Sequence, residues 1–243
     1  MNIKFKPSEA IIDVKNHYCP GCTHGIINNI IGEVLEELNI LNKSIGIASV
    51  GCSVLMYDYL NCDFISASHG RAPAVATAVS RLLKDRVVFT YQGDGDLAAI
   101  GMSEIIHAAL RGENIVVIFI NNCTYGMTGG QMAPTTLKGQ ITETTPYGRE
   151  VDSHGPPVKV CELLETIEGI RYLERVSTHN VREVMKAKKA IKKAFEYVKN
   201  GEGFSFVEIL SICPTNWRKN IYDSLKWVEE NMVKEFELKV FKD

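Results

Sequence analysis

The stretch that decides the fold is VVFTYQGDGD, residues 87–96, together with IVVIFINN, residues 115–122. Residues 87–91 and 115–120 are short apolar runs of the length expected for buried strands. Between them lie a loop with two glycines, residues 92–96, and a helical pattern at residues 102–110. The order of strand, glycine loop, helix and strand predicts an α/β fold with a mostly parallel central sheet and helices on both faces.

The same alternation of strands and helices continues on both sides of this unit. Further strands are predicted at residues 45–50, 172–176 and 204–210, and further helices at residues 25–38, 72–83, 158–168 and 180–200. Asn180 and Glu183 have the spacing of a capping box, which predicts where the last helix begins. Residues 121–157 are rich in Gly, Thr and Pro, and such long loops are typically functional or disordered. Because no repeat or linker interrupts the pattern, residues 1–243 are expected to form one domain.

Composition narrows the class of protein. The chain has 243 residues, of which 45% are hydrophobic and 23% charged, with a formal net charge of −2. This charge gives no reason to expect a nucleic-acid or an anionic-membrane partner. The longest apolar run is too short to cross a bilayer, and the first ten residues lack the apolar core of a secretory signal. We therefore expect a cytoplasmic protein.

Polar residues follow the two central strands. Gly93, Asp94, Gly95 and Asp96 end the first strand, and the pair Asn121–Asn122 ends the second. The carboxyl ends of parallel strands are where open sheets bind ligands, and glycines let the backbone approach a phosphate. A helix start near Gly101 would offer free N–H groups to that phosphate. Either motif alone can be an ordinary turn, but together they predict a site in which Asp94 and Asn122 supply oxygen ligands to Mg²⁺.

The seven cysteines suggest metal or catalytic chemistry more than disulfides, because the number is odd and no export signal is present. Cys19-Pro20-Gly21-Cys22 is compatible with a thioredoxin-like redox pair, half of a zinc site or part of an iron–sulfur site. No good strand precedes it in residues 1–18, and no second close pair follows it. Cys52 and Cys213 each follow a predicted buried strand, so both can meet Cys19 and Cys22 in space. Four converging thiolates suit a [4Fe–4S] cluster.

These motifs together resemble a known family. The GDG and NN motifs resemble the thiamine diphosphate motif, and CPGC, GCS (residues 51–53) and CPT (residues 213–215) resemble the β subunit of 2-oxoacid:ferredoxin oxidoreductases. HGRA (residues 69–72) and YGMTGGQ (residues 125–131) extend the likeness over nearly the whole chain. Thr23 stands where family members usually have Gly, at a position that is not a ligand. The resemblance implies the thiamine diphosphate-binding fold.

The resemblance also implies roles for individual residues. Asp94, Asn122 and the carbonyl of Thr124 would hold Mg²⁺ against the cofactor's diphosphate, and Cys19, Cys22, Cys52 and Cys213 would hold a [4Fe–4S] cluster. The cofactor-binding set is Gly93, Asp94, Gly95, Asp96, Asn122, Thr124, Gly126, Met127 and Thr128. His69 is either a contact to substrate or diphosphate or a structural histidine at a helix entry. Cys62, Cys123 and Cys161 match no ligand position.

The implied reaction is the oxidative decarboxylation of a 2-oxoacid with coenzyme A, with electrons passed to ferredoxin. The Glu that contacts the aminopyrimidine would come from an α subunit, so this chain alone should be inactive; γ and δ subunits are further expected partners. Val54, Leu55 and Met56 follow Cys52, and no Lys or Arg occurs before Arg71. This favours a branched-chain substrate such as 2-oxoisovalerate over 2-oxoglutarate or pyruvate. A non-redox thiamine enzyme and a zinc-stabilised binding module are the rival interpretations.

Overall fold

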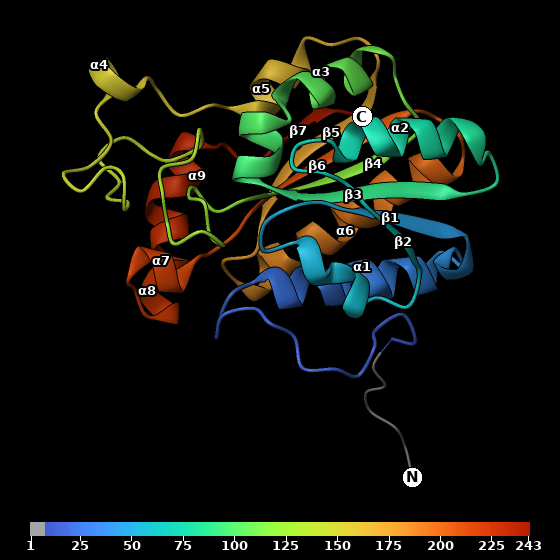
Figure 1. Ribbon diagram of the computed structural model, residues 1–243, viewed down its shortest axis with the longest axis horizontal. Coiled ribbons are helices and arrows are strands. Elements are labelled where there is room, and N and C mark those ends of the chain that lie inside the picture. Colours follow the sequence, from blue (N-terminus) through green and yellow to red (C-terminus); the bar gives the residue numbers. More distant parts are fainter. Residues whose placement is uncertain (1–7) are drawn as a thin grey trace.

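The computed structural model describes residues 8–243. Seven strands form one central sheet in the order β2-β1-β3-β4-β6-β5-β7 (Figure 1). Each pair of neighbours is parallel except β5 and β7, which are antiparallel. The strands are β1 (Ser44–Ala48), β2 (Asp63–Ser66), β3 (Val87–Gly93), β4 (Val116–Asn121), β5 (Ile170–Ser177), β6 (Phe204–Leu210) and β7 (Val240–Lys242).

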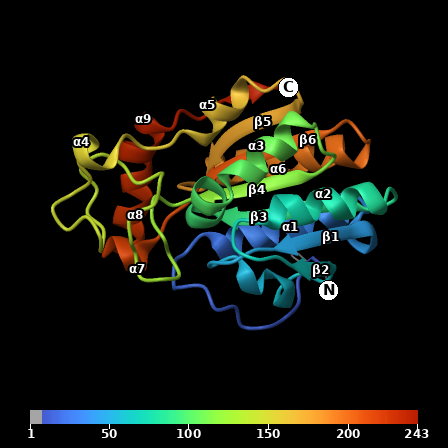
Figure 2. The same ribbon diagram turned by 45° about the horizontal axis from the view of Figure 1, so that its top comes forward.

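The central strands are buried on both faces. Every residue of β1, β4 and β6 is buried, as expected for parallel strands that have helices on each side. One face is covered by α1 (His24–Glu37) and α6 (Val181–Lys199), and the other by α2 (Ala72–Leu82), α3 (Met102–Leu110) and α5 (Val160–Glu165) (Figure 2). The fold is therefore the predicted three-layer α/β arrangement.

A group of short elements lies at the end of the sheet where the central strands finish. The C-terminal helical segment comprises α7 (Pro214–Trp217), α8 (Ile221–Trp227), η4 (Val228–Met232) and α9 (Val233–Glu235). It packs on Leu210, Ile212, Cys123 and Leu137 in a third hydrophobic core. Figure 1 shows this segment, in red, beside the yellow-green loop that carries α4 (Val151–His154). The remaining short helices are η1 (Leu41–Lys43), η2 (Val54–Asp58) and η3 (Gly95–Ile100).

Most predicted elements are confirmed, with boundaries within a few residues. The helix predicted at residues 158–168 is shorter, since α5 covers only Val160–Glu165. The predicted helix start near Gly101 is confirmed, since α3 begins at Met102 with Gly101 as its N-cap. The π-helical turn η3, which begins at Gly95 directly after Asp94 and leads into α3, was not predicted. The strands β2 and β7 and the C-terminal helices were not predicted.

The N-terminal predictions are tested only in part. The expectations about residues 1–10 and 1–18 fall partly on residues 1–7, which lie outside the described residues. From residue 8 onward, Ile11 forms an isolated antiparallel bridge with Leu60. Within residues 8–243 no helix combines the length and apolar character needed to cross a membrane.

Candidate functional site

The predicted magnesium ligands lie together at the carboxyl ends of the two central strands. Gly93 of β3 is opposite Ile120 of β4, so Asp94 and Asn122 leave the sheet side by side. Asp94 is 2% exposed, and its carboxylate accepts hydrogen bonds from the backbone N–H of Asn122 at 3.1 Å and from the Thr135 hydroxyl. Burial raises the pKa of Asp94 to about 7, against the effect of these neutral donors. A cation beside Asp94 would relieve this cost of burial.

The Asn122 side chain supplies a second indication of a cation. In the orientation present, its amide oxygen faces only acceptors: turning the amide would let its nitrogen donate to Asp94 Oδ1 at 3.3 Å and to the Thr124 carbonyl at 2.8 Å. In the orientation present, oxygens of Asn122, Asp94 and Thr124 face one another with no hydrogen-bond donor among them. Turning the amide would supply a donor, and a bound metal ion would instead use the three oxygens as ligands. A carboxylate, an amide oxygen and a carbonyl are the hard ligands that Mg²⁺ prefers. The donor set therefore fits the predicted ion.

A cavity of about 440 Å³ opens above these oxygens. All of the predicted cofactor-binding residues line it: Gly93, Asp94, Gly95, Asp96, Asn122, Thr124, Gly126, Met127 and Thr128. The π-helical turn η3 forms one wall, and Gly95 is needed there because an added Cβ would lie 2.7 Å from the Tyr125 ring. π-Helical turns are frequent at functional sites, and this one begins the helix whose N-terminus faces the cavity.

Three further polar residues of this cavity, Asp96, His69 and Thr128, have protein partners. The buried Asp96 carboxylate accepts from the Gly70 N–H at 2.8 Å and from the Gln92 amide at 2.5 Å, and it pairs with His69 Nδ1 at 2.9 Å. His69 is 41% exposed and lines the cavity. Asp96 therefore fixes one ring nitrogen of His69, and the imidazole is presented to the cavity at a defined angle. The Thr128 hydroxyl donates to the Gln131 side chain at 2.5 Å.

A second cavity, of about 200 Å³, is lined by all four predicted cluster ligands, Cys19, Cys22, Cys52 and Cys213. Cys19 and Cys22 precede α1, Cys52 follows β1, and Cys213 follows β6, so the residues reach one place from three parts of the sequence. In the part of the chain that the structure describes, no three His, Cys, Asp or Glu side chains meet closely enough to hold a single metal ion. The four thiols thus surround a space rather than a point.

The electrostatics of these thiols are unfavourable without a positive centre. Burial, with smaller contributions from Cys213, Cys52 and Cys19, raises the pKa of Cys22 to about 12. Burial also raises the pKa of Cys52 to about 11, with Cys213 and Cys19 again contributing. Thiolates are the metal-binding form of cysteine, so iron bound in the cavity would stabilise the charges that burial and neighbouring thiols now oppose.

The two cavities share a wall. His24, Cys52, Asn122, Gly126 and Met127 line both of them. An added Cβ on Gly126 would lie 3.1 Å from Cys52 Sγ and 3.8 Å from Cys213 Sγ. The loop at residues 122–128, which we call the cofactor loop, therefore lies directly against the cysteines.

His24 lines both cavities but was not predicted as a site residue. It is 2% exposed, its Nδ1 lies 2.5 Å from the Tyr91 hydroxyl, and its ring stacks on Tyr18 with centroids 4.9 Å apart. Burial lowers the pKa of His24 to about 3, so the ring is neutral. Its place directly after CPGC was the available signal, but a lone His at a helix start is more often structural.

Arg149 was also missed, and it organises the irregular loop. It is 4% exposed, and its guanidinium donates to six backbone carbonyls, those of Ala133, Pro134, Thr136, His154, Gly155 and Pro156. Through this loop Thr135 reaches Asp94. Nothing in the spacing of the sequence marks Arg149 as different from a surface arginine.

The other three cysteines lie apart from the second cavity. Cys62 is partly buried, Cys161 is buried in α5, and Cys123 belongs to the cofactor loop with its side chain buried in the third core. None of them lines either cavity among the described residues.

Comparisons with known proteins agree with this geometry. The family described as thiamine pyrophosphate enzyme, C-terminal TPP binding domain, matches residues 49–209. The ketoisovalerate oxidoreductase subunit VorA of Methanothermobacter thermautotrophicus is 49% identical, over 93% of this chain and 48% of that protein. The 2-oxoglutarate synthase subunit KorB of Methanocaldococcus jannaschii is 38% identical, over 89% of this chain and 78% of that protein.

A solved structure extends the match to three dimensions. The 2-oxoglutarate:ferredoxin oxidoreductase from Magnetococcus marinus, with 2-oxoglutarate, coenzyme A and succinyl-CoA bound, superposes with a TM-score of 0.78 at 30% identity, over 93% of this chain and 73% of that chain. The chain spans about half the length of the VorA relative. It belongs to the thiamine pyrophosphate-binding β-subunit family of the 2-oxoacid:ferredoxin oxidoreductases.

Proposed function

We propose that this chain is the thiamine diphosphate-binding subunit of an enzyme that oxidatively decarboxylates a 2-oxoacid with coenzyme A and passes the electrons to ferredoxin. The observation that carries the proposal is the shared wall, in which Cys52, Asn122 and Gly126 line both the oxygen-rich cavity and the cysteine cavity. An enzyme that exports electrons needs its cofactor next to an electron carrier, whereas a plain decarboxylase needs only the first cavity.

Each residue has a defined task in this proposal. Asp94, Asn122 and the Thr124 carbonyl would hold Mg²⁺, and Gly93 and Gly95 leave room for the diphosphate. Thiamine diphosphate, when bound, supplies the electron sink for decarboxylation. His69, oriented by Asp96, would contact the substrate or the diphosphate, and Met127 would line the pocket for the substrate side chain. Cys19, Cys22, Cys52 and Cys213 would hold the [4Fe–4S] cluster that receives the electrons.

The substrate proposed is a branched-chain 2-oxoacid such as 2-oxoisovalerate. Val50, Ile100 and Met127 give the first cavity an apolar wall, and no lysine or arginine occurs among the described residues that line it. Arg71, the nearest candidate in sequence, is engaged by Glu104 at 2.6 Å and by the Ile100 carbonyl at 3.2 Å. A distal carboxylate such as that of 2-oxoglutarate would lack a cation from this chain. The 49% identity to a ketoisovalerate oxidoreductase subunit supports the same choice.

Several components must come from elsewhere. An α subunit would supply the Glu that contacts the aminopyrimidine, and γ and δ subunits, ferredoxin and coenzyme A complete the expected assembly. The cytoplasmic location expected from the sequence stays a prediction, as does the arrangement of residues 1–243 as one domain.

The test is anaerobic purification of the protein with its partner subunits, followed by iron, sulfide and thiamine quantitation. Cys52→Ser should lose about four irons per chain relative to wild type, while Cys62→Ser, a matched control away from the second cavity, should lose none. Thiamine without the cysteine-dependent iron would favour a non-redox thiamine enzyme, and zinc alone would favour a binding module. Spectral bleaching with coenzyme A and 2-oxoisovalerate, but not 2-oxoglutarate, should identify the substrate.

A further inference from the structure

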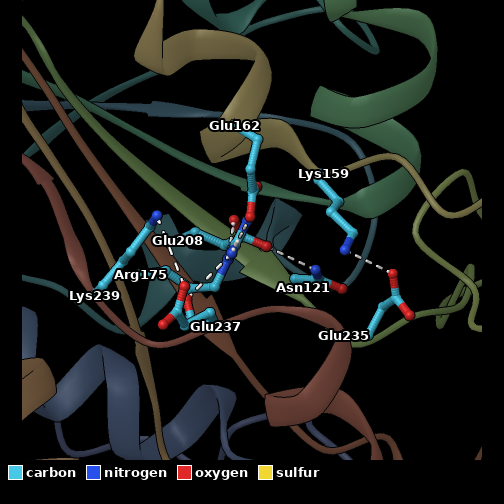
Figure 3. A network of polar contacts seen from close by, with 8 residues as sticks. All are labelled: Asn121, Lys159, Glu162, Arg175, Glu208, Glu235, Glu237 and Lys239. Atoms are coloured by element: carbon cyan, nitrogen blue, oxygen red, sulfur yellow. Dashed lines mark hydrogen bonds and ion pairs between the residues drawn. The ribbon is translucent and has the colours of Figure 1, made fainter.

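A buried ionic network joins β5, β6 and α5 and reaches Asn121 at the end of β4 (Figure 3). Arg175 of β5 and Glu208 of β6 are opposite each other in the sheet, and both side chains are 0% exposed. Arg175 Nε donates to one carboxylate oxygen of Glu208 at 2.8 Å. The other end of the guanidinium makes a two-point contact with Glu162 of α5, at 2.9 and 2.5 Å. The arginine thus bridges two carboxylates in the sheet face under α5.

The second oxygen of Glu208 points toward the cofactor loop. It accepts a hydrogen bond from the Asn121 side-chain amide at 2.7 Å. A carboxylate can only accept, so the NH₂ group of Asn121 must face Glu208 and its amide oxygen must face away. That oxygen accepts from the backbone N–H of Cys123 at 3.2 Å. The orientation of one amide therefore links the ionic network to the backbone of the loop.

The bond from Cys123 to Asn121 closes a side-chain turn around Asn122. Cys123 has a φ of +57°, in the left-handed region that residues other than glycine and asparagine adopt at a cost. The turn places Asn122 and Thr124 on the two sides of Cys123, with the Asn122 side-chain amide 3.3 Å from Asp94 Oδ1 and 2.8 Å from the Thr124 carbonyl. Asn side chains that bond their own backbone two residues later are a recognised way of fixing such turns.

We propose that Glu208 is a positioning residue for the Mg²⁺–diphosphate site: by fixing the orientation of the Asn121 amide, it holds the turn through Cys123 that presents Asn122 and the Thr124 carbonyl to the metal. This inference rests on the proposed function. Arg175 has the supporting task of keeping one oxygen of Glu208 engaged, so that the other is left for Asn121.

A contribution to folding stability alone does not explain why the Arg175–Glu208 pair is buried, whereas the orientation of the Asn121 amide does. Two charges without solvent contact lose their hydration, and replacing such a pair by apolar residues is often neutral or stabilising. Burial would lower the pKa of Arg175, but Glu208 and Glu162 raise it above its ordinary value. An apolar pair could fill the same space, yet it could not specify which way Asn121 points.

The discriminating variant is Glu208→Gln. Arg175 offers only donors, so the new amide must turn its oxygen to Arg175 and its NH₂ group to Asn121. Two NH₂ groups then face each other, and Asn121 must turn over, which removes the acceptor for the Cys123 N–H. We expect the affinity for Mg²⁺, measured by calorimetry on the metal-stripped complex with saturating thiamine diphosphate, to fall by about tenfold or more.

Two further variants separate positioning from stability. Glu162→Gln weakens the other contact of Arg175 without touching Asn121, so the Mg²⁺ affinity should stay at the wild-type value whatever the melting temperature does. The double variant Asn121→Asp with Glu208→Gln exchanges the positions of the amide and the carboxylate. The carboxylate at position 121 then accepts hydrogen bonds from both the amide at position 208 and the Cys123 N–H. It should recover the Mg²⁺ affinity that Glu208→Gln loses.

Asn121→Ala keeps the Arg175–Glu208 pair intact and should weaken Mg²⁺ binding as Glu208→Gln does. Wild-type Mg²⁺ affinity in Asn121→Ala or in a folded Glu208→Gln would overturn the proposal, as would an equal loss in Glu162→Gln or no recovery in the double variant. If the wild-type complex itself shows no Mg²⁺-dependent binding of thiamine diphosphate, the proposed function fails; if only the variants behave like wild type, the positioning role fails alone.

Discussion

At the residue scale, Gly126 in the shared wall is a position where an added methyl group would affect both cavities. Gly126→Ala would place a methyl group 3.1 Å from Cys52 Sγ, a distance that forces the sulfur or the loop to move. We expect this variant to lose cluster iron as well as thiamine, because Gly126 lines both cavities. Iron and thiamine quantitation on the anaerobically purified complex measures both losses.

Gly93→Ala is the matched comparison. Its added methyl group meets no atom within 4 Å, so the fold tolerates it, but the group would project into the space assigned to the diphosphate. Thiamine content should fall while iron content stays at the wild-type value. Loss of iron in Gly93→Ala, or its retention in Gly126→Ala, would contradict the separate assignment of the two cavities.

At the element scale, the irregular loop at residues 121–157 depends on one side chain. Arg149→Met removes the donors to six buried or partly buried carbonyls, and we expect it to lower the free energy of unfolding by at least about 3 kcal/mol. Urea denaturation measures this loss. Arg218→Met is the control, because Arg218 is 79% exposed and pairs with the exposed Glu143, a contact worth about 0–1 kcal/mol.

The ends of α2 and α3 are joined by Glu113. Its nearly buried carboxylate pairs with Arg81 at 2.6 Å and with Arg111 at 2.7 Å. Burial would raise the pKa of Glu113, but the two arginines lower it below its ordinary value of 4.5. As the pH falls, the unfolded chain therefore takes up the proton before the folded protein does. The stability contributed by Glu113 is present above the ordinary pKa of 4.5 and is lost as the pH falls through the lower pKa of the folded state.

The expected result is a difference in unfolding free energy between wild type and Glu113→Gln of about 1–2 kcal/mol at neutral pH. This difference should shrink as the pH falls below the ordinary value of 4.5. Chemical denaturation at a series of pH values measures it. A constant difference across that range would show that the charge of Glu113 does not matter.

The same scale shows what the sequence can predict. β3 and β4 were predictable because parallel strands covered on both faces are continuous apolar runs. β2 is mostly exposed and β7 has only three residues, so neither has an apolar run to reveal it. Strand ends and spacing indicated Asp94, Asn122 and the convergence of four cysteines, whereas the Thr124 carbonyl and the cluster-ligand role of the cysteines came from the family resemblance. Thr135, Arg149 and Glu208 were not, because their partners are backbone groups or side chains distant in sequence.

At the scale of the whole molecule, residues 236–242 return to one edge of the sheet, where β7 pairs with β5. The carbonyls of Glu237 and Lys239 accept from Arg175, at 3.2 Å from its side chain and 3.0 Å from its backbone N–H. Phe236 is fully buried in the third core, and its ring lies 5.4 Å from the Arg175 guanidinium. Figure 3 shows Glu237 and Lys239 around Arg175, so residues 236–242 complete the surroundings of the ionic network.

Phe236→Ala should therefore cost about 3–5 kcal/mol of unfolding free energy, the usual range for deleting a buried aromatic ring. The control is Tyr222→Ala, since Tyr222 is 84% exposed on the neighbouring α8. Thermal and urea unfolding of the two variants should differ clearly, and similar small losses in both would mean that the C-terminal segment contributes little to the core.

The shared wall also has a thermodynamic consequence. Cys52, Asn122 and Gly126 belong to loops that form part of both cavities. A ligand that orders these loops in one cavity meets part of the entropic cost of ordering them for the other. Linkage requires that the benefit be reciprocal: the factor by which a filled cysteine cavity tightens cofactor binding equals the factor by which the cofactor tightens retention of the cluster. Under the proposed function the two loading events are then cooperative, so forms with only one cavity filled are less populated than they would be if the cavities filled independently.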